Sequence, residues 1–274
     1  SLPTPFVRGA RVYSTNGQPL ATVANQWRDS NGDGVAESFM TYEGFPAGAT
    51  SSFQPLLMRD NYSWSTGVSF QDTAGSSGNV TATYFPVDNG LQCGSNAYGL
   101  AANGIAIGNP LPPSGQCGSS PTTFVGSGWS TRGSNLAAVV NQATTGSLKA
   151  MSYSAVGQGT QTVVLPLVLK NRNVLWGTGA WYSGLTVQNL GDSQATVRIV
   201  YYNADGSLLG WSEPDRQVPA RASHVYNPAP TDAGIVTFEG SAVVTADQPI
   251  AVVVNLIASG SSDDTAMSYT GVNH

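Results

Sequence analysis

The nine residues DSNGDGVAE, Asp29 to Glu37, have the types and spacing of a loop that binds a hard cation. Oxygens at alternate positions can converge on Ca²⁺, and Gly34 permits the sharp turn that such loops need. The candidate ligands are Asp29, Asn31, Asp33, the Val35 carbonyl and Glu37. A full EF-hand is excluded, because Met40 stands where its bidentate Glu would be. Two interpretations stay open, a calcium loop or a polar hairpin tip.

Aromatic residues are the second candidate for binding. A ring face on a β-sheet can stack on a sugar, because it offers apolar area beside a weak acceptor. Four such residues in the second half of the chain could form a patch: Trp176, Trp181, Tyr182 and Trp211. They predict either a ligand patch or, on the other interpretation, core packing or a contact between subunits.

Residues for catalysis are scarce. The two histidines are His224 and His274, and no G-x-S-x-G turn accompanies them. The four glutamates lie in unrelated settings, so no acid pair for glycoside hydrolysis can be named. His, Cys and acidic residues also lack the spacing of a zinc site. We therefore predict that the chain is not an enzyme.

The two cysteines, Cys93 and Cys117, lie in one Gly-, Asn- and Pro-rich stretch. A disulfide between them would restrict this loop by about 3 kcal/mol in the chain-entropy model. The alternative is two free thiols in the same loop. A disulfide favours an exported protein, because the cytosol keeps thiols reduced.

Composition excludes several classes of partner. The 274 residues include 11 basic and 16 acidic side chains, a formal net charge of -5. Nucleic acids and anionic lipids both attract clustered basic residues, which this chain lacks. Charged residues make up 10%, against about 25% in an average domain. No apolar run approaches the ~18 residues of a membrane span.

An internal repeat organises the chain. A segment that starts with Phe and ends with Asn occurs at 6–25, 124–141 and 238–255, and each copy is followed by a Met-containing marker. The markers are SFMTY (38–42), KAMSY (149–153) and TAMSY (265–269). We call each segment with its marker a rear half.

A second set of motifs, the front half, occurs twice. FQPLLMRDN (53–61) matches VLPLVLKNR (164–172), STGVSFQDT (65–73) matches YSGLTVQNL (182–190), and VTATYFPVDNG (80–90) matches VRIVYYNADGS (197–207). Pro55 and Pro166 are 111 residues apart, as are Met40 and Met151. The order is therefore rear, front–rear, front–rear.

The expected fold is all-β, because alternating β-branched residues and Asn/Asp-Gly turns recur without a helical period. Each full repeat has ~110 residues, close to an immunoglobulin-like β-sandwich. We expect an N-terminal half repeat (1–47), a first sandwich unit (48–157) and a second sandwich unit (158–274). About seven strands are expected in each unit, the last three from the rear half.

The phrase GLTVQNLGDSQATVRIVYYNADGSLL, with LPLVLKN before it, resembles the tandem immunoglobulin-like β-sandwich repeats of exported bacterial cell-surface and filament proteins. The resemblance covers both full units, and its motifs encode strands and turns. It implies a location outside the cell and a role as spacer, stalk, adhesin or subunit of a layer. It implies no catalytic residue.

A rear half without a front half leaves strand edges uncovered, and open edges invite pairing with another chain. The N-terminal half could be a cut in a longer array, could pack on the first unit, or could dock on the next subunit; of these three, we expect docking on the next subunit. We predict an extracellular structural protein that assembles with itself, on the surface of a bacterium or outside it. The alternatives are an adhesin or carbohydrate-binding module with a cell-surface glycan as partner, and a non-catalytic region of a secreted hydrolase.

Overall fold

The computed structural model describes residues 9–29, 37–45, 47–117, 123–173, 175, 179–260 and 265–274. These residues form strands and no α-helix, which confirms the predicted all-β class. Within the same ranges, no helix of the length and hydropathy needed to cross a membrane occurs.

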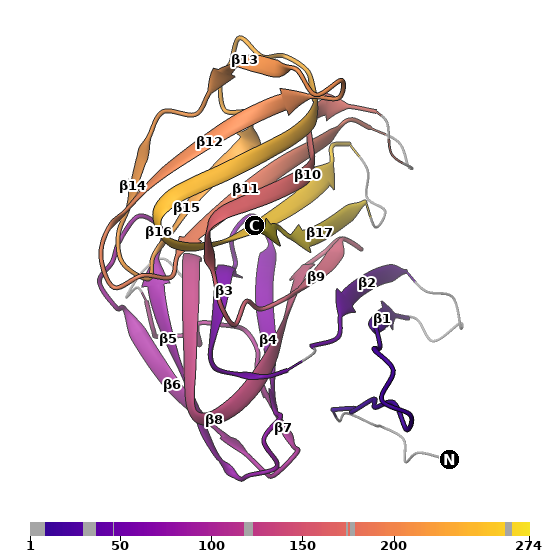
Figure 1. Cartoon of the computed structure of the whole chain (residues 1–274), viewed down its shortest axis with the longest axis vertical. Helices are drawn as coiled ribbons and strands as arrows, with labels where there is room; N and C mark the ends of the chain where they lie inside the picture. Colours follow the sequence, from indigo (N-terminus) through magenta and orange to yellow (C-terminus); the bar gives the residue numbers. More distant parts are fainter. Residues whose placement is uncertain are drawn as a thin grey trace.

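The strands form three sheets that follow one another along the chain (Figure 1). The first sheet is a hairpin of β1 (Val23–Arg28) and β2 (Ser38–Glu43). The second contains β3 (Ala49–Arg59), β4 (Trp64–Asp72), β5 (Gly78–Pro86), β6 (Gly94–Leu100), β7 (Ile105–Gly108), β8 (Phe124–Thr144) and β9 (Ala150–Ser154). The third contains β10 (Thr160–Arg172), β11 (Trp181–Asn189), β12 (Ala195–Asn203), β13 (Leu208–Ser212), β14 (Arg216–Val218), β15 (Ser223–Ala229), β16 (Phe238–Ala258), β17 (Ala266–Thr270) and β18 (Val272–Asn273). We call the second and third sheets, with their cores, the first and second units.

One strand of 21 residues joins the two halves of each unit. Residues 124–131 of β8 pair with β3 and β5, whereas residues 136–144 pair with β4 and β9. In the same way β16 pairs first with β10 and β12 and then with β11 and β17. The rear half of the first unit therefore has two strands, β8 and β9, where three were expected, whereas that of the second unit has three, β16, β17 and β18. In both units one long strand pairs in both parts of the sheet, because its polar middle continues in extended form.

The repeated Pro-Leu and Ser-Tyr motifs meet in the structure. The pairing of β3 shifts register between Gln54 and Leu57, and that of β10 shifts between Leu165 and Val168, because a proline cannot donate to the ladder. The leucine after each proline bonds a tyrosine hydroxyl instead. Tyr153 Oη donates to the Leu56 carbonyl (2.8 Å) and accepts from its N–H (3.2 Å), and Tyr269 does the same at Leu167 (2.6 and 3.3 Å).

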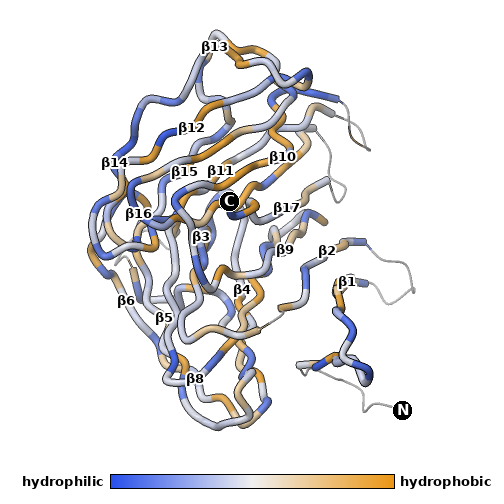
Figure 2. Tube along the Cα trace, in the orientation of Figure 1, coloured by the Kyte–Doolittle hydropathy of each residue, from blue (hydrophilic) through white to orange (hydrophobic). Residues whose placement is uncertain are grey.

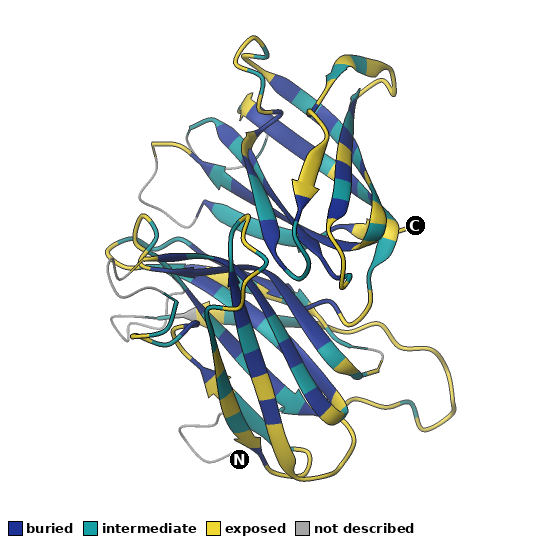
Figure 3. Ribbon diagram, turned by 90° about the vertical axis from the view of Figure 1, so that its left-hand side faces the viewer, coloured by how far each residue is buried: buried dark blue, intermediate teal, exposed yellow. Residues whose placement is uncertain are grey.

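The cores follow from alternation along the strands. In β12, Val197, Ile199 and Tyr201 are buried while the residues between them are more exposed. Apolar residues concentrate along the strands of both units (Figure 2), and buried and exposed residues alternate along many of them (Figure 3). Each unit encloses its own apolar cluster, as expected for sheets with one face packed and one face towards solvent.

The strand β11 departs from this alternation. Its residues Leu185 to Asn189 are all buried, whereas the corresponding outward residues of β4, Ser69 and Gln71, are half-buried. The difference arises because the first unit covers the outward face of β11 and of the second half of β16. The tandem units therefore share an interface.

Candidate functional site

The three rear halves adopt one register. Each pairs its long strand with its marker strand so that an Asn lies opposite a Ser or Thr. The pairs are Asn25 with Thr41, Asn141 with Ser152, and Asn255 with Ser268. The hairpin β1–β2 is thus the equivalent of the β8–β9 and β16–β17 pairs, and the repeat seen in the sequence is also a repeat in backbone geometry.

The three marker strands stack on one another, with β9 between β2 and β17 (Figure 1). Hydroxyl groups join them in a fixed direction. Ser152 Oγ donates to the Thr41 carbonyl (2.8 Å), and Ser268 Oγ donates to the Ser152 carbonyl (2.7 Å). A second row runs beside the first, from Ser154 Oγ to the Glu43 carbonyl (2.9 Å) and from Thr270 Oγ1 to the Ser154 carbonyl (3.3 Å). The same contact therefore joins the hairpin to the first unit and the first unit to the second.

This arrangement differs from the expected docking of the N-terminal half on another subunit. The N-terminal half repeat packs on the first unit of its own chain, through β2 and β9. Ser38 adds a hydrogen bond to the Leu148 carbonyl across the same contact.

An apolar cluster forms the centre of the interface between the two units. It contains Phe53 and Val156 of the first unit and Leu190 and Ala251 of the second. Trp129 packs against this cluster, and the Arg221 guanidinium of the second unit lies 4.4 Å from the centre of its ring. A cation over an indole face is attracted by the ring quadrupole, so Arg221 both covers and holds this cluster.

Buried amides flank the apolar cluster. Asn255 Nδ2 donates to Gln142 Oε1 (3.0 Å), and Gln142 Nε2 donates to Asn255 Oδ1 (3.4 Å). Gln188 Nε2 donates to the carbonyls of Gly128 (3.1 Å) and Arg221 (3.0 Å). Buried amides must find partners, so these bonds fix the register of one unit on the other. The motif Asn-Gln, present in the first two rear halves, was the sequence signal for this contact, and the sequence analysis missed it.

Gln26 and Asn141 occupy the equivalent positions where the hairpin meets the first unit. Gln26 Oε1 and Asn141 Oδ1 are buried and accept no hydrogen bond from the described residues. The hairpin junction is therefore a less complete copy of the junction between the units.

A charged contact also crosses the interface between the units. Asp88 of the first unit binds Arg216 (2.9 Å) and His224 Nδ1 (2.7 Å) of the second. His224 thus has a structural role, and the described residues bring no three His, Cys, Asp or Glu side chains together as a metal site.

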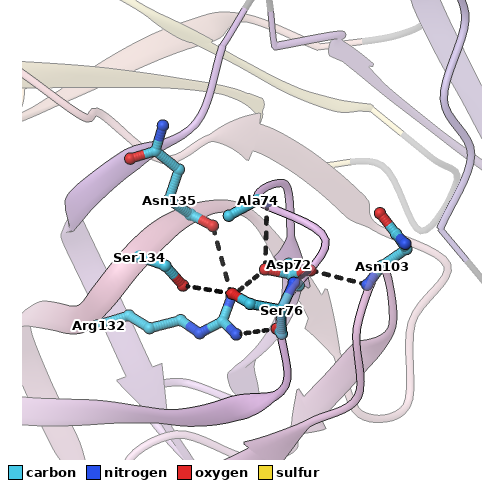
Figure 4. Close-up of polar contacts among 7 residues, drawn as sticks. All are labelled: Asp72, Ala74, Ser76, Asn103, Arg132, Ser134 and Asn135. Atoms are coloured by element: carbon cyan, nitrogen blue, oxygen red, sulfur yellow. Dashed lines mark hydrogen bonds and ion pairs between the residues drawn. The ribbon is translucent and has the colours of Figure 1, made fainter.

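A buried ion pair, Asp72 with Arg132, organises the far end of the first unit (Figure 4). The Asp72 carboxylate also accepts hydrogen bonds from the backbone N–H groups of Asn103 (2.7 Å), Ala74 (3.2 Å) and Ser76 (3.0 Å). Burial acts to raise the pKa of Asp72, but these bonds and the guanidinium outweigh it and lower the pKa to about 2. In the second unit, Asn189 takes the position of Asp72 and donates to three carbonyls. Because a neutral amide bonds the backbone at the same position in the second unit, we assign the Asp72–Arg132 pair a structural role.

The predicted calcium loop connects β1 to β2. Asn31, Asp33 and Val35 lie outside the described residues, whereas Asp29 follows β1 and Glu37 precedes β2. The flanks of the loop are strands, as expected. Calcium binding stays a prediction.

The predicted aromatic patch is not assembled by the described residues. Trp181 is fully buried in the core of the second unit, so it cannot serve as a platform for sugar. Trp211 stacks on Tyr201 at a centroid distance of 6.1 Å, and Tyr182 donates its hydroxyl to Asn171 Oδ1 (3.0 Å). Trp176 lies outside the described residues. For Trp181 and Trp211 the interpretation as core residues holds, because a large apolar ring gains most free energy when buried.

The disulfide between Cys93 and Cys117 is confirmed, with Cα atoms 4.7 Å apart. It links the start of β6 to the turn that follows β7. Both half-cystines pack against the core of the first unit.

No family model matches the chain, and no curated protein matches it. One similar solved structure is the crystal structure of Thermotoga maritima 1070, with a TM-score of 0.34 and 17% identity over 42% of this chain and 96% of that chain. A similarity of this size carries no argument. The function must be inferred from the way in which this chain packs on itself.

Proposed function

We propose that the chain is an extracellular structural protein whose copies assemble into a filament, sheath or surface layer of a bacterium. The observation that carries this proposal is the contact between rear halves, which occurs twice in one chain with the same direction and the same strand register. A contact that repeats in one direction without closing on itself is the kind that builds linear arrays.

Several features support a location outside the cell. The chain has a disulfide in the Gly-rich loop of the first unit, and disulfides persist in oxidising compartments. Low charge suits a protein that packs closely against copies of itself, because fewer ionic groups must lose their hydration.

In this proposal each unit is an immunoglobulin-like β-sandwich. Two features favour it: antiparallel pairing throughout, and a tyrosine hydroxyl that closes on backbone groups in each unit. The hairpin loop that begins at Asp29 and ends at Glu37 would hold Ca²⁺ near the end of the stack, where an ion can affect assembly.

Electron microscopy of the purified protein, with and without a calcium chelator, tests the proposal. We expect fibres or sheets with a regular subunit repeat, and a loss of order on chelation if the loop binds calcium at a subunit contact. Monodisperse particles at high protein concentration in both conditions would contradict assembly.

A further inference from the structure

The stack of rear halves has an open end at the hairpin β1–β2. Val23, Asn25 and Trp27 of β1 lie on the same face as Phe39, Thr41 and Glu43 of β2. The register pairs Trp27 with Phe39, Asn25 with Thr41, and Val23 with Glu43. We call these six residues the hairpin face. In the first and second units, the equivalent face packs on the body that precedes it in the chain.

The three apolar residues of the hairpin face are exposed to solvent. Val23 is 67% exposed, Trp27 57% and Phe39 55%, whereas Val253, the equivalent of Val23 in the second unit, is fully buried against the first unit. Exposed apolar residues that lie next to one another mark an interaction surface. The position of the hairpin in the repeat indicates which surface would cover it.

The last marker strand in the described residues is β17. Among the described residues β17 pairs only with β16, so its second edge is unpaired. This edge holds the Ser268 carbonyl, which corresponds to the Thr41 and Ser152 carbonyls that accept hydroxyl groups within the chain. Beside it Val272 is 59% exposed, while its equivalent Val156 is buried where the second unit covers the first.

We propose that the hairpin face of one copy docks on the β17 edge of a second copy, so that the contact between rear halves continues from chain to chain. Thr41 Oγ1 of one copy donates to the Ser268 carbonyl of the other, as Ser152 and Ser268 donate within the chain. Val272 is then covered as Val156 is. This inference rests on the proposed function and names the surfaces through which assembly occurs.

The hairpin face differs from its equivalents in its apolar area and in its polar partners. Trp27 and Phe39 replace Ala143 and Ala150, which adds apolar area. Leu256 of the receiving end replaces Gln142, and Glu43 replaces a hydroxyl donor, so two polar contacts are lost and the added apolar area must outweigh them. A contact within one chain benefits from the high effective concentration of its partner. A contact between chains lacks this advantage and depends more on buried apolar surface.

Engineered cysteines give a direct test, because the chain has no free cysteine. Thr41→Cys and Ser268→Cys are introduced together and the protein is oxidised. Since β9 lies between β2 and β17, the two new thiols of one chain cannot meet. We expect a ladder of covalent multimers on a non-reducing gel, and no ladder from either single variant. Ser152→Cys with Ser268→Cys is the positive control, since this pair should close within the chain.

The outcomes separate the interface from the proposed function. Filaments from the native chain without a ladder from the double variant, while the control pair closes, would overturn this interface and leave assembly intact. Monodisperse native protein would overturn the proposed function, and a ladder in that protein would still support the docking contact. If the native chain forms no filaments and the double variant forms no ladder, both the interface and the proposed function are contradicted.

A second variant tests the apolar part of the contact. Trp27→Asp is expected to raise the protein concentration needed for assembly at least about tenfold, which corresponds to the loss of one well-buried ring. Leu208→Asp is the matched control, since Leu208 is 62% exposed on β13, away from the stack. Equal effects of the two substitutions on assembly, with unchanged thermal unfolding, would contradict the proposal.

Discussion

Asn255 and Gln142 exchange two hydrogen bonds across the boundary between the tandem units, and both side chains are buried there. The geometry is reciprocal, because each amide is at once donor and acceptor. Such a pair permits one alignment of the units and penalises others, since a shift would leave two buried amides unsatisfied.

Loss of both amides should destabilise the interface by less than the sum of the two single losses. Gln142→Ala alone is expected to cost about 1–3 kcal/mol, because it leaves Asn255 buried without its partner. The double variant with Asn255→Ala should cost clearly less than the sum of the two single variants. Denaturant unfolding of the four proteins measures this coupling, and additive effects would show that the amides do not act as a pair.

The tyrosine contacts at the Pro-Leu bulges predict a second effect. Tyr269→Phe should lower the free energy of unfolding of the second unit by about 1–2 kcal/mol, because the Leu167 backbone loses its partner. Tyr153→Phe should act equally on the first unit through Leu56. Tyr62→Phe is the control, since Tyr62 is 92% exposed. Thermal unfolding would contradict the assignment if all three variants behaved alike.

The ion pair in the first unit predicts an asymmetric response to substitution. Arg132→Met leaves the Asp72 charge buried and should cost about 3–5 kcal/mol. Adding Asp72→Asn should restore a large part of that loss, because the second unit uses Asn189 at the same place. Chemical denaturation measures both changes. A double variant no more stable than Arg132→Met would contradict the comparison of the two units.

The lowered pKa of Asp72 predicts how stability depends on acid. Because the pKa is about 2 in the folded chain and 3.8 in the reference state, the charged carboxylate favours folding. This contribution is complete above about pH 5 and is lost as the pH falls through 4 towards 2. Between these pH values, the free energy of unfolding should fall more steeply with decreasing pH for the native chain than for Asp72→Asn. Parallel curves would show that Asp72 does not titrate in this range.

The disulfide should stabilise the first unit alone. Replacing Cys93 and Cys117 by Ser is expected to reduce its stability by about 3 kcal/mol, as the unfolded loop regains freedom. Calorimetry before and after reduction should move the transition of the first unit and leave that of the second unchanged. Equal shifts of both would indicate that the units unfold together.

The repeat explains why much of the fold followed from sequence. Recurring Pro-Leu and Ser-Tyr motifs predicted equivalent positions, and the structure shows that Tyr153 and Tyr269 bind the leucines that follow Pro55 and Pro166. Alternation in β12 predicted a strand with one buried face. These signals are local, because they depend on side-chain direction and on the missing N–H of proline.

The prediction of an aromatic patch does not hold for Trp181. Composition and spacing do not state which face of a strand a ring occupies, and Trp181 lies on the inner face of β11. The length of the 21-residue strands was also not predicted, because their polar middles lack the alternation that marks a strand.

The sequence by itself determined the all-β class, the order of rear and front halves, the cysteine pair and the low charge. These features follow from periodicity, composition and short motifs, which depend on neighbouring residues and not on how the sheets pack. Only the tertiary structure decided that β2, β9 and β17 stack in one direction, and that Gln142 meets Asn255 rather than solvent. Contacts between residues over 100 positions apart depend on how whole sheets pack, and no short pattern encodes the face that one sheet presents to another.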